Sequence, residues 1–110
     1  MKPTITYDDF SRLDLRVGKV VAASLPDWSN KLIRYEVDFG QEIGKRVLFS
    51  GIRKWYTPES LINKSFIFVV NLEVKKMGDE QSQGMMLMVD SEKPVLFTLM
   101  EEVPAGSVVR

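Results

Sequence analysis

The sequence predicts an all-β domain, and three observations lead to that class. Apolar side chains alternate with charged ones from Ile33 to Phe39, which is the period of a strand with one buried face. Two continuous apolar runs, Phe66 to Leu72 and Met85 to Val89, have the length of strands buried on both sides. Helix signals are confined to two short segments, so helices cannot form the body of the fold.

The first of these helical segments is Tyr7 to Leu13, for which Thr6 is a plausible N-cap. Residues 13 to 17 then alternate as a half-buried strand. The apolar positions change phase at Gly18, which predicts a bulge or a sharp strand bend there. Strongly bent first strands are typical of small closed barrels.

The polar segment Leu25 to Asn30 predicts a loop, and Gly40 to Gly44 predicts a turn before a third strand over Arg46 to Phe49. Trp55 to Asn63 predicts a short helix capped by Thr57, with proline at its first position. The tail from residue 94 onward predicts an extended strap with one more short strand.

Five strands with a short helix between the third and fourth, an N-terminal helical turn and a C-terminal strap match one architecture. It is the OB-fold, a five-stranded, partly open Greek-key barrel. The length of 110 residues predicts a single domain over residues 1–110.

The composition argues against catalysis. The chain has no cysteine and no histidine, which removes thiolate chemistry and the commonest general base and transition-metal ligand. Adjacent acids such as Asp8-Asp9 and Asp79-Glu80 are typical of solvated turns, and there is no phosphate-binding glycine motif. We therefore expect no catalytic residue, no metal site and no cofactor. The N-terminus lacks a signal-peptide core and no apolar run could span a membrane, so the expected location is cytoplasmic.

Basic side chains gather in the middle of a chain whose 15 basic and 15 acidic residues cancel. Between Ile43 and Lys76 there are seven basic residues against two acidic ones, whereas the last thirty residues hold two basic and four acidic ones. This distribution indicates a local basic patch, although charges scattered around a barrel would give the same count. The seven basic residues are Lys45, Arg46, Arg53, Lys54, Lys64, Lys75 and Lys76.

A series of short motifs closely resembles the structure-independent tRNA-binding domain family. In chain order they are Asp9-Phe10, Asp14-Leu15-Arg16-Val17-Gly18, Asn30-Lys31-Leu32, Val37-Asp38 with Gly40, Ser50-Gly51-Ile52, Thr57-Pro58-Glu59, Asn71-Leu72 and Ser82-x-Gly84-Met85. The family includes free-standing dimeric proteins, domains appended to methionyl- and phenylalanyl-tRNA synthetases, and an export-associated chaperone branch. The resemblance covers the chain from about Tyr7 to its C-terminus.

The resemblance implies an OB-fold that dimerises partly through the C-terminal strap and recognises the outer corner of tRNA by shape rather than by anticodon. Nothing in the chain resembles a synthetase catalytic core, so a free-standing module is implied. The positions that match RNA-facing residues of the family are Ser50, Asn71, Lys75, Lys76, Ser82 and Met85.

This chain departs from the family pattern within the same region. Val74-Lys75 stands where the family usually has Pro-Arg, so a point charge replaces a bidentate phosphate fork. The loop from Gly78 to Ser82 is one residue longer than in many members. Residues 37–44 and 61–64 look most like the chaperone branch, whereas residues 82–85 look more like the tRNA-binding branch.

Three functions fit these residues. In the first, Lys75, Lys76, Arg53 and Lys54 neutralise RNA phosphates, and Asn71, Ser82 and Gln83 hydrogen-bond sugars or base edges. In the second, methionines 77, 85, 86 and 88 adapt to unfolded peptides, as in a chaperone, although residues 86 and 88 also suit the core. In the third, the domain docks onto a synthetase or another partner without RNA affinity of its own.

Aromatic residues and the tail leave further alternatives. Trp55 and Tyr56 could stack on bases or pack the short helix onto the barrel, and Trp28 could be an interface residue or a lid. The strap from Pro94 to Arg110 is rich in apolar residues, so it either wraps its own barrel or buries itself against a second copy.

Overall fold

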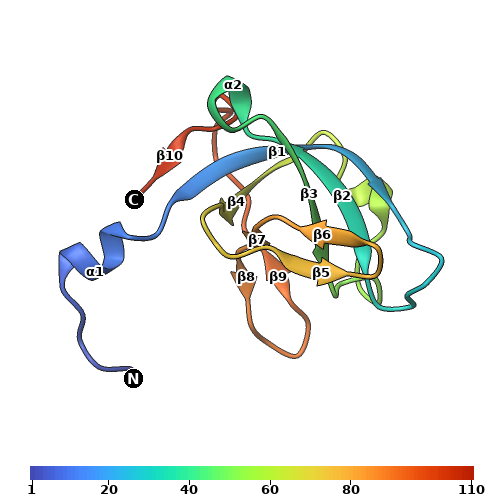
Figure 1. The fold of residues 1–110 in the computed structure, drawn as a ribbon, viewed down its shortest axis with the longest axis horizontal. Helices are drawn as coiled ribbons and strands as arrows, with labels where there is room; N and C mark the ends of the chain where they lie inside the picture. The colour runs from blue at the N-terminus through green and yellow to red at the C-terminus, as the bar shows by residue number, and fades with distance from the viewer.

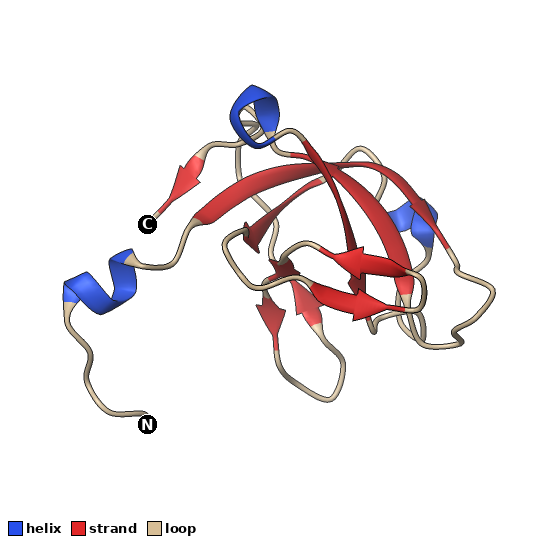
Figure 2. Ribbon diagram, viewed as in Figure 1, coloured by secondary structure: helices blue, strands red, loops and turns tan.

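Five antiparallel strands form a nearly closed barrel, which confirms the predicted OB-fold (Figures 1 and 2). The computed structural model describes all 110 residues. The sheet order is β3-β2-β1-β4-β7. The barrel strands are β1 (Leu15–Ser24), β2 (Ile33–Asp38), β3 (Lys45–Ser50), β4 (Ser65–Val69) and β7 (Met85–Met86).

Strand β1 organises the barrel because it pairs with two neighbours along its length. Its first half pairs with β4 and its second half with β2. The irregularity in its pairing falls between Val20 and Ala22, just after Gly18, where the change of phase had predicted a bulge or a sharp strand bend. Gly18 serves a different purpose: a Cβ there would lie about 2.5 Å from the Phe39 ring and still closer to Val37. The glycine leaves room for the buried side chains of Val37 and Phe39.

The alternating residues of β2 supply the centre of the core, as predicted. Ile33, Tyr35 and Val37 are fully buried, and Phe39 packs edge-on against Phe68 at 5.1 Å between ring centroids. Burying each such side chain contributes about 1.5–3 kcal/mol. Met86 is also buried in this cluster, which bears out the core reading of that methionine.

The segment predicted as a turn and the segment predicted as a short helix each contain a single helical turn. Residues Gly40–Ile43 form α2, and Pro58–Ser60 form the 3-10 helix η1, shorter than the predicted Trp55–Asn63 segment. Thr57 caps η1 as expected, because its Oγ1 accepts a hydrogen bond from the amide of Ser60. Asn63 ends the segment at a φ of 67°, a conformation that asparagine tolerates.

The polar connection between β4 and β7 is an ordered hairpin. Its strands are β5 (Lys75–Met77) and β6 (Glu80–Ser82), joined by Gly78 and Asp79. A two-residue hairpin turn needs positive φ, and Gly78 supplies it at 60°. The hairpin folds across the front of the barrel in Figure 1, so the candidate residues within it have a defined geometry.

The N-terminal helical turn projects from the barrel (Figure 1). It is α1 (Tyr7–Ser11), and Thr6 and Asp9 form a reciprocal capping box at its start. None of its residues is buried.

The C-terminal strap follows its own barrel at both ends. It contains β9 (Val95–Leu96), which pairs with β8 (Met88–Val89), and β10 (Val108–Val109), which pairs with the start of β1. Arg16 fixes the strap further by contacting Asp14, Glu42 and the carbonyl of Gly106. Along its length the strap leaves apolar side chains in solvent: Val95, Phe97, Met100, Val103 and Val108.

Candidate nucleic-acid interface

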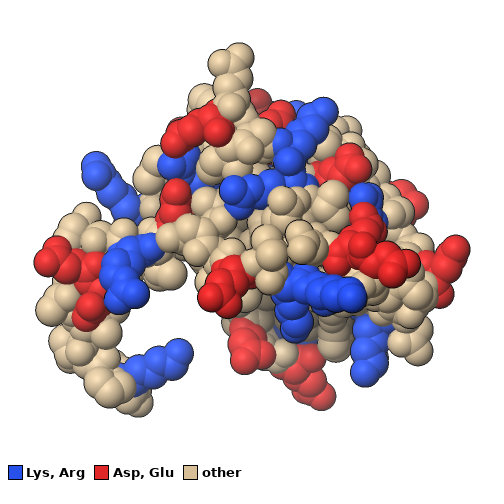
Figure 3. All heavy atoms as spheres, in the orientation of Figure 1, with Lys and Arg blue, Asp and Glu red and all other residues tan.

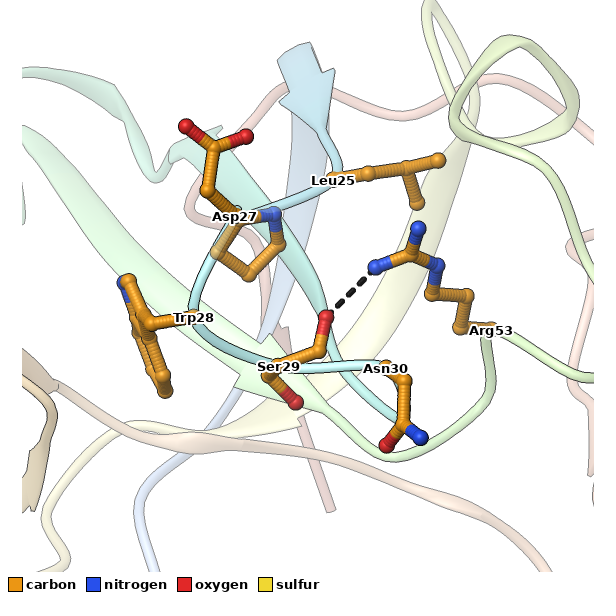
Figure 4. A pocket seen from close by; sticks show the side chains of 7 residues that line it. Leu25, Asp27, Trp28, Ser29, Asn30 and Arg53 are labelled. Atoms are coloured by element: carbon orange, nitrogen blue, oxygen red, sulfur yellow. Dashed lines mark hydrogen bonds between the residues drawn. The ribbon is translucent and has the colours of Figure 1, made fainter.

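Three connections meet on one side of the barrel. They are the loop between β1 and β2, the turn that follows β3, and the β5–β6 hairpin. Nη1 of Arg53 donates to the carbonyl of Ser29 at 2.5 Å (Figure 4). The backbone amide of Arg53 donates to the carbonyl of Lys31. In an OB-fold these loops flank the face that binds oligonucleotides.

Trp28 links the first of these loops to the hairpin. Its indole packs on Phe49 with 5.7 Å between ring centroids, and its atoms lie about 3 Å from where a Cβ on Gly78 would be. The side chain is half exposed, so it covers the hairpin turn as a lid and also remains open to solvent. Figure 4 shows that Trp28 and Arg53 extend to opposite sides of the loop.

An ion pair holds the second strand of the hairpin. Arg34, on the outer face of β2, contacts the Glu80 carboxylate through Nε and Nη2, each at 2.9 Å. This hydrogen bonding lowers the pKa of Glu80 and raises the pKa of Arg34. The sequence alone does not predict this contact, because the two residues are far apart in the chain and each resembles an ordinary surface charge.

The seam of the barrel uses Ser82, the last residue of β6, and Gln83, which follows it. The Gln83 amide donates to the carbonyl of Val47, and Gln83 Oε1 accepts from the Val47 amide at 3.2 Å. Ser82 Oγ accepts from the Phe49 amide at 3.1 Å, and Ser82 is buried. Arg46 reaches across the seam to the carbonyls of Val70 and Gln83. The side-chain oxygens of Ser82 and Gln83 are therefore engaged inside the protein.

Two more of the candidate residues bond internally. Asn71 Oδ1 accepts from the Asp14 amide, and its Nδ2 donates to the carbonyl of Arg12, so it fixes the segment between α1 and β1. Ser50 Oγ hydrogen-bonds the hydroxyl of Tyr35, whose burial raises its pKa. Sequence reasoning had no means to separate a positioning serine or asparagine from one that faces a ligand.

The remaining candidates are open to solvent. Lys75 and Lys76 are exposed on β5, and Met85 is half exposed at the start of β7. Lys54 is exposed and its ammonium lies 5.5 Å from the centroid of the Trp55 ring. Arg53 is partly buried but uses only one of its guanidinium N–H groups in a bond to the protein.

The candidates do not form one continuous cluster. Lys76 and Gln83 line one depression, together with Asp79 and Glu80. Arg53 and Lys54 line another with Trp55. Asn71 lies in a third, beside Arg12 and Leu13. Basic and acidic groups are interspersed over the face seen in Figure 3, so the surface is not a uniform basic patch.

The chain contains no group of acidic residues arranged to hold a metal ion. It also contains no helix long and apolar enough to cross a membrane.

The barrel, its short interstrand helix and the loops around this face define an OB-fold domain. Residues 15–108 match the family described as "Putative tRNA binding domain". The chain belongs to this family of tRNA-binding domains.

Relatives in sequence are methionine–tRNA ligases. The enzyme from Methanosarcina mazei is 43% identical over 110 residues, which is 98% of this chain and 15% of the ligase. The enzyme from Xylella fastidiosa is 50% identical over 86 residues, which is 77% of this chain and 12% of that ligase. The chain therefore spans only a small part of the ligases that it matches.

Solved structures of similar chains include free-standing ones. A methionyl-tRNA-synthetase-related protein from Pyrococcus horikoshii superposes with a TM-score of 0.91 at 38% identity, covering 99% of this chain and 100% of that one. The chaperone CsaA from Bacillus anthracis superposes with a TM-score of 0.86 at 33% identity, covering 98% of this chain and 100% of that one.

Proposed function

We propose that residues 1–110 act as one non-catalytic module that binds tRNA through its shape and backbone, without reading the anticodon. Family membership supports tRNA as the partner. The observation that carries the proposal is the anchored hairpin, which holds the exposed Lys75 and Lys76 on the oligonucleotide-binding side of an OB-fold. With tRNA as partner, the proposed place of action is the cytoplasm.

The candidate residues divide into two roles in this proposal. Lys75, Lys76, Arg53, Lys54 and Met85 contact the RNA, because their side chains are accessible. Ser50, Asn71, Ser82 and Gln83 hold the backbone beneath that surface through the bonds described above. Lysines neutralise phosphates without selecting a base, which suits recognition of a shape shared by many tRNAs.

A titration of bulk tRNA at two salt concentrations tests this function. Each neutralised phosphate contributes about 0.9 to the slope of log affinity against log salt, so four cations give a slope of about 3 to 4. Affinity should then fall roughly a hundredfold between 50 and 200 mM salt. Binding that ignores salt, or no binding at the lower concentration, would exclude the proposal.

A matched pair of variants assigns the hairpin. K75Q/K76Q should weaken binding to all tRNAs alike and lower the salt slope by about 2. K19Q/K93Q removes the same charge from two lysines outside the hairpin, on β1 and in the β8–β9 connection, and should bind like the wild type. Equal losses in both variants would show that only net charge matters.

A second candidate function is the binding of unfolded peptides. The similarity to CsaA chaperones favours it, as do the half-exposed Met85 and the exposed Met100. Adaptable methionines on a surface suit varied apolar partners. Suppression of client aggregation by the pure protein, unaffected by nuclease, would support this function, and failure to hold any client would remove it. Docking to a synthetase would instead appear as nuclease-resistant capture of that enzyme without tRNA affinity.

We also propose that two copies associate through the strap. Its exposed residues Val95, Phe97 and Val103 lie close together in sequence, on a segment whose ends are fixed to the barrel. A second copy would cover this apolar surface. Sedimentation at micromolar concentration tests the association, and a monomer there would refute it.

A further inference from the structure

We infer that the depression between the β1–β2 loop and the turn after β3 is a separate binding site for an unpaired nucleotide of RNA. Its lining is Asn30, Lys31, Gly51, Arg53, Lys54 and Trp55. This inference rests on the proposed RNA function and adds a second contact, which lies outside the hairpin and takes a different part of the ligand.

The charge of this depression sets it apart from the one beside the hairpin. Three of its lining residues are cations and none is a carboxylate. The hairpin depression combines Lys76 with Asp79 and Glu80, and one of those acids is already paired with Arg34. An anion therefore meets a more favourable local field between Lys31 and Lys54 than at the hairpin turn.

The Arg53 guanidinium is held in place before any ligand arrives. Its Nη1 donates to the carbonyl of Ser29, and its backbone amide donates to the carbonyl of Lys31. The other guanidinium N–H groups have no partner in the protein. A fixed fork with free donors suits a phosphate oxygen, which it can contact through two hydrogen bonds.

An aromatic platform lies next to this fork. Trp55 is 37% exposed, and the Lys54 ammonium lies 5.5 Å from its ring centroid. Lys54 is a flexible surface side chain, so an incoming base can take its place on the ring while the ammonium moves to the phosphate. Base stacking on an aromatic ring is tolerant of sequence, and it requires a base that is free of its own helix.

The remaining lining residues leave room for the nucleotide and offer polar contacts. A Cβ on Gly51 would meet no atom within 4 Å, so the backbone is open to approach there. The side-chain amide of Asn30 also lines the depression and can pair with a base edge. Together these groups provide a stacking ring, a phosphate fork and a polar end, which is the chemistry of a nucleotide site.

The test isolates the two tryptophans. In a W28F variant Trp55 is the only tryptophan, so its fluorescence reports on this depression. Titration with an unpaired RNA octamer should quench the Trp55 fluorescence in a saturable manner. Inorganic phosphate, added to the same total concentration of phosphate charge, should not quench it. R53Q, made in the W28F background, should weaken the binding of the octamer about tenfold. Its melting temperature should show that the protein remains folded.

Loss of the ring is tested by anisotropy of a labelled octamer. W55A should weaken binding roughly tenfold, and W55F, which keeps an aromatic ring, should recover most of it. If W55A is less stable than the wild type, the comparison of W55F with W55L at equal stability decides. The inference would be overturned if the variant without an aromatic ring, W55A or W55L, bound the octamer as tightly as the wild type. Quenching of Trp55 by phosphate alone would also overturn it.

The two proposals fail in different ways. K75Q/K76Q should weaken the binding of folded tRNA and leave the affinity of this depression for the octamer unchanged. Octamer binding with no tRNA binding would reject the proposed function and leave the nucleotide site standing. Binding of tRNA with no change in Trp55 fluorescence would reject the nucleotide site and leave the proposed function standing. Quenching of Trp55 by an unfolded peptide but not by RNA would reject the nucleotide and favour the chaperone function.

Discussion

The indole of Trp28 covers Gly78, the first residue of the turn between β5 and β6. Gly78 has a φ of 60°, and a Cβ there would lie 2.9 Å from the Trp28 ring. The β1–β2 loop and the hairpin therefore hold each other, and the position of Lys75 and Lys76 depends on a residue that carries no charge.

We predict that G78A moves the hairpin. The substitution combines a strained positive φ with a clash against the indole, so either the turn or Trp28 must shift. The affinity for tRNA should fall severalfold, while the melting temperature changes little because the hairpin lies outside the core. Trp28 emission in a W55F background measures the shift. G44A is the matched control, because Gly44 also has a positive φ but a Cβ there meets open space. Equal tRNA affinity in G78A and the wild type would show that the hairpin needs no fixed position.

The ion pair between Arg34 and Glu80 predicts a pH dependence. Hydrogen bonding to Arg34 places the pKa of folded Glu80 below its ordinary value. Its stabilising effect is therefore fully present above the ordinary glutamate range, about 4.3, and is lost as the pH falls through the lowered value. Both side chains are partly exposed, so the effect is below about 1 kcal/mol and concerns the hairpin rather than the whole domain.

Trp28 emission in the W55F background follows this loss. The acid transition should vanish in E80Q and persist in E36Q, since Glu36 lies farther from Arg34, at 3.5 Å. Identical acid transitions in E80Q and the wild type would contradict the assignment.

Gly18 predicts the strongest loss of stability. A Cβ there would sit 2.4 Å from Val37 and 2.5 Å from the ring of Phe39, both of which are buried. Neither neighbour has space to move, so G18A should destabilise the domain by about 1–3 kcal/mol or more. Urea unfolding measures this loss, and G44A is a control for the general effect of removing a glycine, although its positive φ adds some strain. A G18A protein as stable as the wild type would mean that the side chains of Val37 and Phe39 can shift to make room.

Asn71 separates a structural role from an RNA contact. N71A removes the hydrogen bonds to the Asp14 amide and the Arg12 carbonyl, which should cost about 1–2 kcal/mol locally. Faster hydrogen exchange at the Asp14 amide, with the β2 core unchanged, would reveal this local effect. If tRNA affinity falls while that exchange rate stays at the wild-type value, Asn71 contacts the RNA directly.

The sequence predicted the barrel because periodicity and burial reflect the same physics. Residues 33 to 39 show this best, since their alternation translates directly into a buried face. The N-cap roles of Thr57 and Thr6 were also predicted, because a cap is a local interaction.

The candidate site was less predictable because its geometry depends on distant pairs. Ser82 and Gln83 contact β3, Asn71 contacts the segment before β1, and Glu80 contacts β2. Residue type alone gives the same expectation for a serine that faces RNA and one that accepts a hydrogen bond from a strand. The hairpin was missed because two strands of three residues are too short to show a period.

The bonds that close the barrel come from Ser82, the last residue of β6, and from Gln83, which follows it. None of them comes from the turn residues Gly78 and Asp79, so the seam makes no demand on the length of the turn. An insertion in the turn would lengthen the arm that carries the lysines and leave the barrel closed, since lengthening a surface loop has a small entropic cost. Evolution can therefore alter the reach of this arm toward its ligand independently of the body that supports it.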